Sequence, residues 1–289
     1  MLKKTLLVLF AFLAALGVGI ALSYTSLKGD YLFGSRLAQW GLVAAAVAGL
    51  ILGAARGMLK KKNAIEGEVV TRHGVGSVIS HWVTAAGIFT AIYSGVVMGF
   101  FIVNGKSIGF VPVFAGQFNH YIPALNVHYF AVLTMLFGGF FFGADYIATR
   151  DWTLLVPNMQ DIIGGFFGKY FLRRKWEKED KYLSSQKDAF VPFAVIGIVM
   201  LVTGAIKVAG HVWTGTNGIS ASALGWATVI HDVFMVIIIL YILVHVGMVA
   251  ALGHWPAFRS YFTGTISTKH VEEHHPVWYE KLKTGANKS

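Results

Sequence analysis

Residues 225–252 read GWATVIHDVFMVIIILYILVHVGMVAAL, and this stretch decides the fold. The run is longer than the roughly 20 apolar residues that cross a bilayer as a helix, yet it contains His231 and His245. At about 100° and 1.5 Å per residue, the interval between them is about 40° short of four turns and about 21 Å long. The stretch therefore predicts a transmembrane helix with two imidazoles on nearly one side, one in each half of the bilayer.

The rest of the chain has the composition of a membrane protein. Hydrophobic residues make up 55% of the sequence and charged residues 13%. Apolar stretches that can span a bilayer cover 5–23, 38–56, 81–102, 124–147 and 190–209, besides 225–252. The sequence has no cysteine, which excludes disulfides, cysteine-held iron–sulfur clusters, covalent c-type haem and cysteine zinc sites. We therefore predict an all-α bundle in which histidines hold any redox cofactor.

Lysine and arginine gather in alternate connections, which predicts the orientation of the spans. The net charge of +10 therefore indicates topology rather than binding to nucleic acid. The connections that carry little positive charge hold only Lys28, Arg36 and Lys106. The rich segments hold Lys3 and Lys4; Arg56, Lys60, Lys61, Lys62 and Arg72; Arg150, Lys169, Arg173, Arg174, Lys175, Lys178, Lys181 and Lys187; and Arg259, Lys269, Lys281, Lys283 and Lys288. With six spans, these segments and both termini are cytoplasmic.

The spans and connections divide the chain into three parts. Residues 1–65 form an N-terminal extension with a second span and a first span, 5–23, that suits a retained anchor better than a cleaved signal peptide. Residues 66–257 form a four-helix core with a cytoplasmic connection at 148–189, in which 158–171 can form an amphipathic helix at the membrane interface. Residues 258–289 form a cytoplasmic tail.

Four histidines fall within or at the mouth of predicted spans, where ionisable residues usually serve function. His81 opens the third span on the cytoplasmic side, and His128 lies near the outer start of the fourth. Depth therefore pairs His81 with His245 (the inner pair) and His128 with His231 (the outer pair). Each pair can supply two axial imidazoles to a haem b. His120 is the rival to His128, and Arg72 and Lys207 are candidates by depth for the haem propionates.

The other histidines lie in polar segments and are given no ligand role: His73, His211, His254, His270, His274 and His275.

Several short motifs resemble the gamma subunit of respiratory formate dehydrogenase, the cytochrome b membrane anchor of that complex. They are SHW at 80–82, NVHYF at 126–130, LVTG at 201–204, the spaced His231 and His245, and HHPVWY at 274–279. The resemblance covers about residues 70–285, and 1–65 has no counterpart in the short four-helix form of that family. It implies two haems b with the same ligand pairing.

The resemblance also implies partners and a substrate. An iron–sulfur subunit, attached to a molybdenum or tungsten catalytic subunit, would deliver electrons to the outer haem. From the inner haem they would reach a quinone, menaquinone or ubiquinone, near the cytoplasmic face of the bacterial inner membrane. Tyr182 and Gln186 match the family's quinone stretch, although Leu183 and Ser185 depart from it. This chain would have no catalytic residue and no formate-oxidising site of its own.

Other functions remain open at this stage. The same di-haem module can serve another molybdoenzyme or a hydrogenase, with electrons running in either direction. A transporter whose histidines relay protons would need broken helices and acidic partners, for which Asp145 and Asp232 are the candidates. A structural anchor without a cofactor is the remaining alternative.

Overall fold

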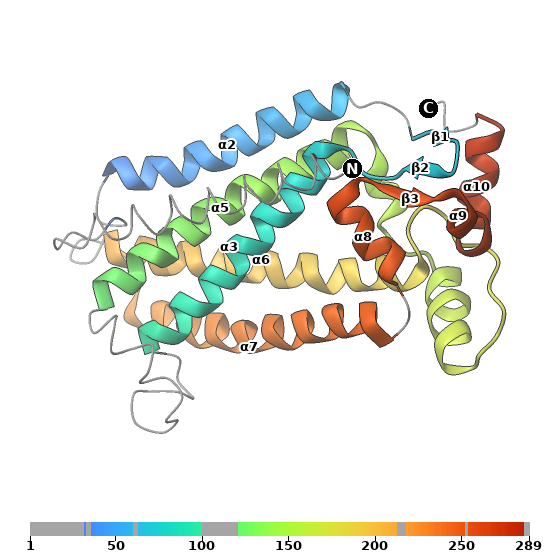
Figure 1. The fold of residues 1–289 in the computed structure, drawn as a ribbon. Helices are drawn as coiled ribbons and strands as arrows, with labels where there is room; N and C mark the ends of the chain where they lie inside the picture. The colour runs from blue at the N-terminus through green and yellow to red at the C-terminus, as the bar shows by residue number, and fades with distance from the viewer. Residues whose placement is uncertain are drawn as a thin grey trace.

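The described part of the chain in the computed structural model has a bundle of five long helices (Figure 1). The structure describes residues 32, 36–59, 63–99, 121–212, 218–251 and 254–285; the predicted span 5–23 and His120 lie outside them. The long helices are α2 (Arg36–Met58), α3 (Val75–Gly99), α5 (Tyr121–Ala148), α6 (Ser184–Val212) and α7 (Ala221–Ala251).

Each of these helices is long and apolar enough to cross a membrane, which confirms the five predicted spans in this part of the chain. The third span begins at Val75 rather than at His81, because the helix extends beyond the apolar run through Ser77 and Ser80, which are both buried. His81 therefore lies inside α3, not at its start.

The helices pack in two groups. Helices α2 and α3 pack against α5, and α6 packs against α7. Glycine allows α2 to approach α5 closely, because a Cβ atom on Gly53 would lie 2.2 Å from the carbonyl oxygen of Phe141. Near the same end, Arg56 forms an ion pair with the buried carboxylate of Asp145. The second span of the N-terminal extension is thus part of the bundle.

A small sheet with three short helices closes one end of the bundle, and we call this unit the cap (Figure 1). Strands β1 (Ile65–Glu66), β2 (Val69–Thr71) and β3 (Thr265–Ser267) are antiparallel in the order β1-β2-β3. The helices are α8 (Trp255–Thr263), α9 (Thr268–His274) and α10 (Pro276–Lys283). Val70, Ile266, Val271 and Trp278 form its core. The predicted helical bundle is confirmed, and the sheet is an addition that the sequence analysis did not foresee.

The connection between α5 and α6 packs against the start of α6. It contains a 3-10 helix, η3 (Asp151–Leu154), and a π-helix, η4 (Asp161–Phe171), where an amphipathic helix was predicted. Lys187 of α6 pairs with Asp161 at 3.1 Å, and Lys169 pairs with Glu179 at 3.0 Å. Glu179 also accepts a hydrogen bond from the backbone N–H of Ser184, at 2.7 Å, and so caps α6.

The described segments rich in lysine and arginine share one end of the molecule. Helices α2, α5 and α7 end beside the cap, and α3 and α6 begin there (Figure 1). The described connections 63–74 and 148–183 and the segment 254–285 therefore lie on the same side, as the charge pattern predicted.

Candidate functional site

The two histidines of the outer pair face each other across the two helix groups. His128 is on α5 and His231 is on α7, and their ring centroids are 6.5 Å apart with an interplanar angle of 65°. Each ring is held by a hydroxyl group from a neighbouring helix. His128 Nδ1 lies 2.9 Å from Ser94 Oγ of α3, and His231 Nδ1 lies 2.8 Å from Thr203 Oγ1 of α6.

These hydroxyl groups fix which nitrogen of each imidazole carries the proton. Ser94 Oγ donates to the carbonyl of Thr90 at 2.7 Å, so its oxygen accepts from His128 Nδ1. Thr203 Oγ1 donates to the carbonyl of Val199 at 2.7 Å and accepts from His231 in the same way. Both rings therefore keep the proton on Nδ1 and leave the Nε2 lone pair available to a metal, the arrangement typical of metal-bound histidine.

The outer pair fits a metal atom between its two rings. A first-row metal lies about 2 Å from an imidazole nitrogen that binds it. Two such bonds on opposite sides of one metal therefore place the ring centroids about as far apart as the 6.5 Å between His128 and His231. The hydroxyls of Ser94 and Thr203 are buried and have no charge, so they orient the rings without competing for the metal. Lys207, a candidate by depth for a haem propionate, lies close enough to both rings for an electrostatic interaction.

The inner pair lies nearer the cap and has a different environment. His81 of α3 is close enough to His245 of α7 for an electrostatic interaction between them. Tyr261 of α8 lies 4.3 Å from His81, and Tyr241 stacks on His245 at 5.9 Å, both measured between ring centroids. Within the described residues, neither histidine of this pair makes a hydrogen bond through its ring. Aromatic contacts thus replace the hydroxyl groups that hold the outer pair.

The predicted quinone residues lie at the start of α6, and Tyr182 interacts with Tyr261, whose ring lies 4.3 Å from that of His81. Tyr182 is buried, and its hydroxyl lies 2.5 Å from that of Tyr146. Gln186 Oε1 accepts from Arg72 Nη2 at 3.1 Å and from the backbone N–H of Leu183 at 3.2 Å. The second bond caps the start of α6, so Gln186 has a structural role as well as the predicted one.

Burial perturbs the ionisable groups around Tyr182. It raises the pKa of Tyr182 and of Tyr261, so both phenols stay protonated at neutral pH. Burial, together with the charges of Lys169 and Arg72, lowers the pKa of His254 to about 4. The Nε2 atom of His254 lies 3.4 Å from the hydroxyl of Tyr170 in η4.

Two histidines that the sequence analysis placed in polar segments are buried. His73 is 4% exposed and stacks on Tyr261 at 4.3 Å, and His275 is 0% exposed. His275 Nδ1 donates to the carbonyl of Asp180 at 2.7 Å. The polar composition of these segments hid their burial, because the sheet brings together residues far apart in sequence.

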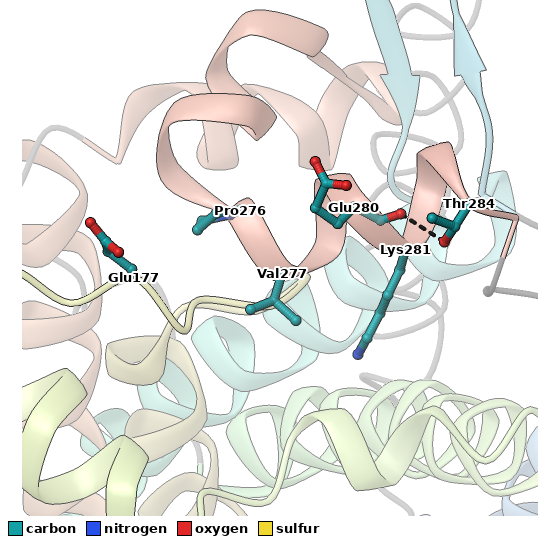
Figure 2. Close-up of a pocket in the computed structure, with 6 residues that line it drawn as sticks. All are labelled: Glu177, Pro276, Val277, Glu280, Lys281 and Thr284. Atoms are coloured by element: carbon teal, nitrogen blue, oxygen red, sulfur yellow. Dashed lines mark hydrogen bonds between the residues drawn. The ribbon is translucent and has the colours of Figure 1, made fainter.

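A groove of about 490 Å³ on the surface of the cap is separate from these residues. Figure 2 shows its lining, which comes from α10 and from the segment before α6. The lining residues are Glu177, Pro276, Val277, Glu280, Lys281 and Thr284. None of the predicted ligand or quinone residues lines it, so we do not include it in the candidate site.

The fold and the histidines define a class of protein: a multi-pass helical membrane protein in which His128 and His231 face each other at a separation that fits a metal. Residues 72–264 match the family model of prokaryotic cytochrome b561. The chain therefore belongs to the prokaryotic cytochrome b561 family, and we conclude that it is a multi-pass protein of the bacterial inner membrane. Membership implies haem b binding and electron transfer across the membrane. No curated protein sequence matches the chain significantly.

Proposed function

We propose that the chain is the membrane cytochrome b subunit of a formate dehydrogenase and binds two haems b. His128 and His231 would hold the outer haem, and His81 and His245 the inner one. The observation that carries this proposal is the outer pair, whose rings lie 6.5 Å apart with both protons kept on Nδ1. The inner pair likewise takes one histidine, His81, from the α3–α5 group and the other, His245, from α7.

Each group of residues has its own part in this function. When bound, haem b supplies one-electron redox chemistry. The imidazoles would hold the two haems at different depths, and Ser94 and Thr203 would fix the orientation of the outer ligands. Electrons from an iron–sulfur partner would enter near the outer pair and leave near the inner pair, where Tyr182 and Gln186 would contact a quinone. The protonated phenol of Tyr182 can donate a hydrogen bond to a quinone oxygen.

The assignment to formate dehydrogenase is supported by the motif at 274–279 and its position. His275 and Trp278 of this motif are buried in the cap, where His275 holds the carbonyl of Asp180. The backbone N–H of Val277 also donates to the carbonyl of Glu179, at 3.2 Å. The motif thus holds the segment that leads directly into Tyr182 and Gln186. These contacts are a structural reason for the motif at 274–279 and the quinone stretch to occur in the same chain.

The alternative of a proton transporter has little support in the structure. Asp145 pairs with Arg56 rather than with a histidine, and Asp232 interacts with Lys207. Helix α7, which carries two of the four histidines, is continuous from Ala221 to Ala251. Broken helices with acidic partners for the histidines, which that function would require, do not occur among the described spans.

Optical difference spectra of native membranes test the proposal, with a strain that lacks the gene as the control. We expect formate and dithionite each to reduce a b-type signal that the control strain lacks. A signal reduced by dithionite alone would contradict the formate partner and direct the search to hydrogen or another donor. If the chain is present in the membrane and no b-type signal depends on it, the haem assignment itself is wrong.

A further inference from the structure

Arg72 is a buried cation that has no ion-pair partner in the described part of the chain. Its side chain follows β2 directly and the residue is 1% exposed. Nη2 donates to the carbonyl of Lys181 and to Gln186 Oε1, both at 3.1 Å. Nε and Nη1 are buried and have no hydrogen-bond partner in the part of the chain that the structure describes. Because burying a guanidinium is costly, two unsatisfied donors on one arginine indicate a ligand that the protein chain does not supply.

The surroundings of Arg72 select an anion. Three tyrosines, Tyr146, Tyr182 and Tyr261, lie close enough to interact with its charge. Burial is the main cause of the lowered pKa of His254 and of His275, and the positive charge of Arg72 lowers both further. No aspartate or glutamate forms an ion pair with Arg72 among the described residues. The guanidinium would therefore be stabilised by an anion with which it can form charge-assisted hydrogen bonds, and a carboxylate is such an anion.

Contacts through α8 place this cation beside the inner pair. Tyr261 lies 4.3 Å from the ring of His73, the neighbour of Arg72, and 4.3 Å from the ring of His81. Trp82 Nε1 donates to the backbone carbonyl of Tyr261 at 2.7 Å and so fixes α8 against α3. A haem at the inner pair would bring two carboxylates to this end of the bundle, because haem b has two propionate groups.

We propose that Arg72 binds a propionate of the haem held by His81 and His245. This inference rests on the proposed ligation of the inner haem. Two further features hold the guanidinium in place. The backbone N–H of Arg72 donates to the carbonyl of Gly264 at 2.9 Å, and Nη2 is held by Lys181 and Gln186. The same residue therefore connects the haem carboxylate to Gln186 of the proposed quinone site.

Redox titration of both haems in Arg72→Gln and Arg72→Lys tests this inference on the full chain in membranes. Loss of the cation leaves the carboxylate charge unbalanced, which favours the oxidised iron. We expect Arg72→Gln to raise the oxidised-to-reduced ratio of the inner haem about tenfold at a fixed potential. This corresponds to a decrease of about 59 mV in its midpoint potential for one electron. Arg72→Lys should shift it in the same direction by less, because it keeps the charge and loses the planar fork. The outer haem should be unchanged in both.

Two controls make the result specific. Arg259→Gln removes an exposed charge from α8 and should leave both potentials unchanged. His81→Ala identifies the inner haem by its loss, and a His81→Ala protein with two haems would overturn the ligand assignment rather than the role of Arg72. The Arg72 proposal is overturned if Arg72→Gln keeps both wild-type potentials, including the case in which only quinone affinity changes. If Arg72→Gln does not accumulate with haem, wild-type potentials in Arg72→Lys overturn it.

Discussion

At the scale of single residues, two uncharged hydroxyl groups orient the histidines of the outer pair. Ser94 and Thr203 each donate to a carbonyl of their own helix and accept from an imidazole Nδ1. This arrangement sets the tautomer of the ring without bringing a charge into the apolar bundle. Such partners of metal-binding histidines typically change metal affinity by about 10–100-fold when they are removed.

We therefore expect Ser94→Ala and Thr203→Val to weaken binding of the outer haem by about 10–100-fold. The inner haem should be retained in both variants. Haem content of the purified protein during titration with haem measures the effect. Thr90→Ala is the matched control, because the hydroxyl of Thr90 bonds to the carbonyl of Ala86 on its own helix and not to a histidine. Wild-type haem content in both variants would show that these hydroxyls do not position the ligands.

The four histidines could be predicted from the sequence, but the residues that orient the outer two could not. The interval between His231 and His245 and the depth of each span paired His128 with His231, and the structure brings these two together. Ligation by any of the four histidines remains a prediction. Ser94 and Thr203 could not be selected from the sequence, because a serine or threonine in an apolar helix usually bonds its own backbone, which these two also do.

At the scale of helices, glycine decides how α2 joins the bundle. A Cβ atom on Gly49 would lie 2.4 Å from the carbonyl oxygen of Phe137, and one on Gly53 would lie 2.2 Å from that of Phe141. Real Cβ atoms do not approach a backbone oxygen so closely, so a larger residue must push the two helices apart. Since neighbouring helices in a membrane associate mainly through such close packing, these glycines determine the position of α2.

Gly53→Ala should destabilise the chain by about 1–3 kcal/mol, the usual cost of inserting a methyl group into packed structure. Gly139→Ala on α5 is the control, because a Cβ atom there meets no other atom within 4 Å. Thermal unfolding in detergent compares the two variants. Equal melting temperatures for Gly53→Ala and the wild type would mean that α2 is not held against α5 in this way.

The cap shows where sequence analysis fails for whole elements. Its strands are two or three residues long, too short for an alternating pattern to be visible, and β2 pairs with β3 from the opposite end of the chain. The helical spans were predictable because each needs a long apolar run, whereas the sheet depends on pairing between distant segments.

Burial of histidines should make the cap sensitive to acid. Burial lowers the pKa of His270 to about 4 and that of His275 well below its usual value. Between these values and the ordinary pKa of about 6.5, the unfolded cap binds more protons than the folded one. Its stability is therefore complete above about pH 6.5 and falls as the pH decreases toward 4.

Hydrogen–deuterium exchange at pH 7.5 and pH 5, corrected for the intrinsic exchange rate, measures this effect. We expect α9 and α10 to lose protection at pH 5, while α2 and α5 keep theirs. Unchanged protection of α9 and α10 at the lower pH would contradict the account of the buried histidines.

At the scale of the whole molecule, the histidine pairs connect two groups of helices. Helices α2, α3 and α5 pack together, α6 packs against α7, and each pair takes one residue from α3 or α5 and one from α7. A haem at each pair would therefore join the groups as well as carry electrons between the two sides of the membrane. Membership of the prokaryotic cytochrome b561 family shows the electron-transfer class, and the two-haem arrangement is our proposal.

The most direct test of that proposal is the haem content of the purified chain and of four single variants. We expect two haems b per chain in the wild type and one in each of His81→Ala, His128→Ala, His231→Ala and His245→Ala. His81→Ala and His245→Ala should lose the same spectral species, and His128→Ala and His231→Ala should lose the other. Two haems in any variant, or different losses within a pair, would contradict the assignment of the ligands.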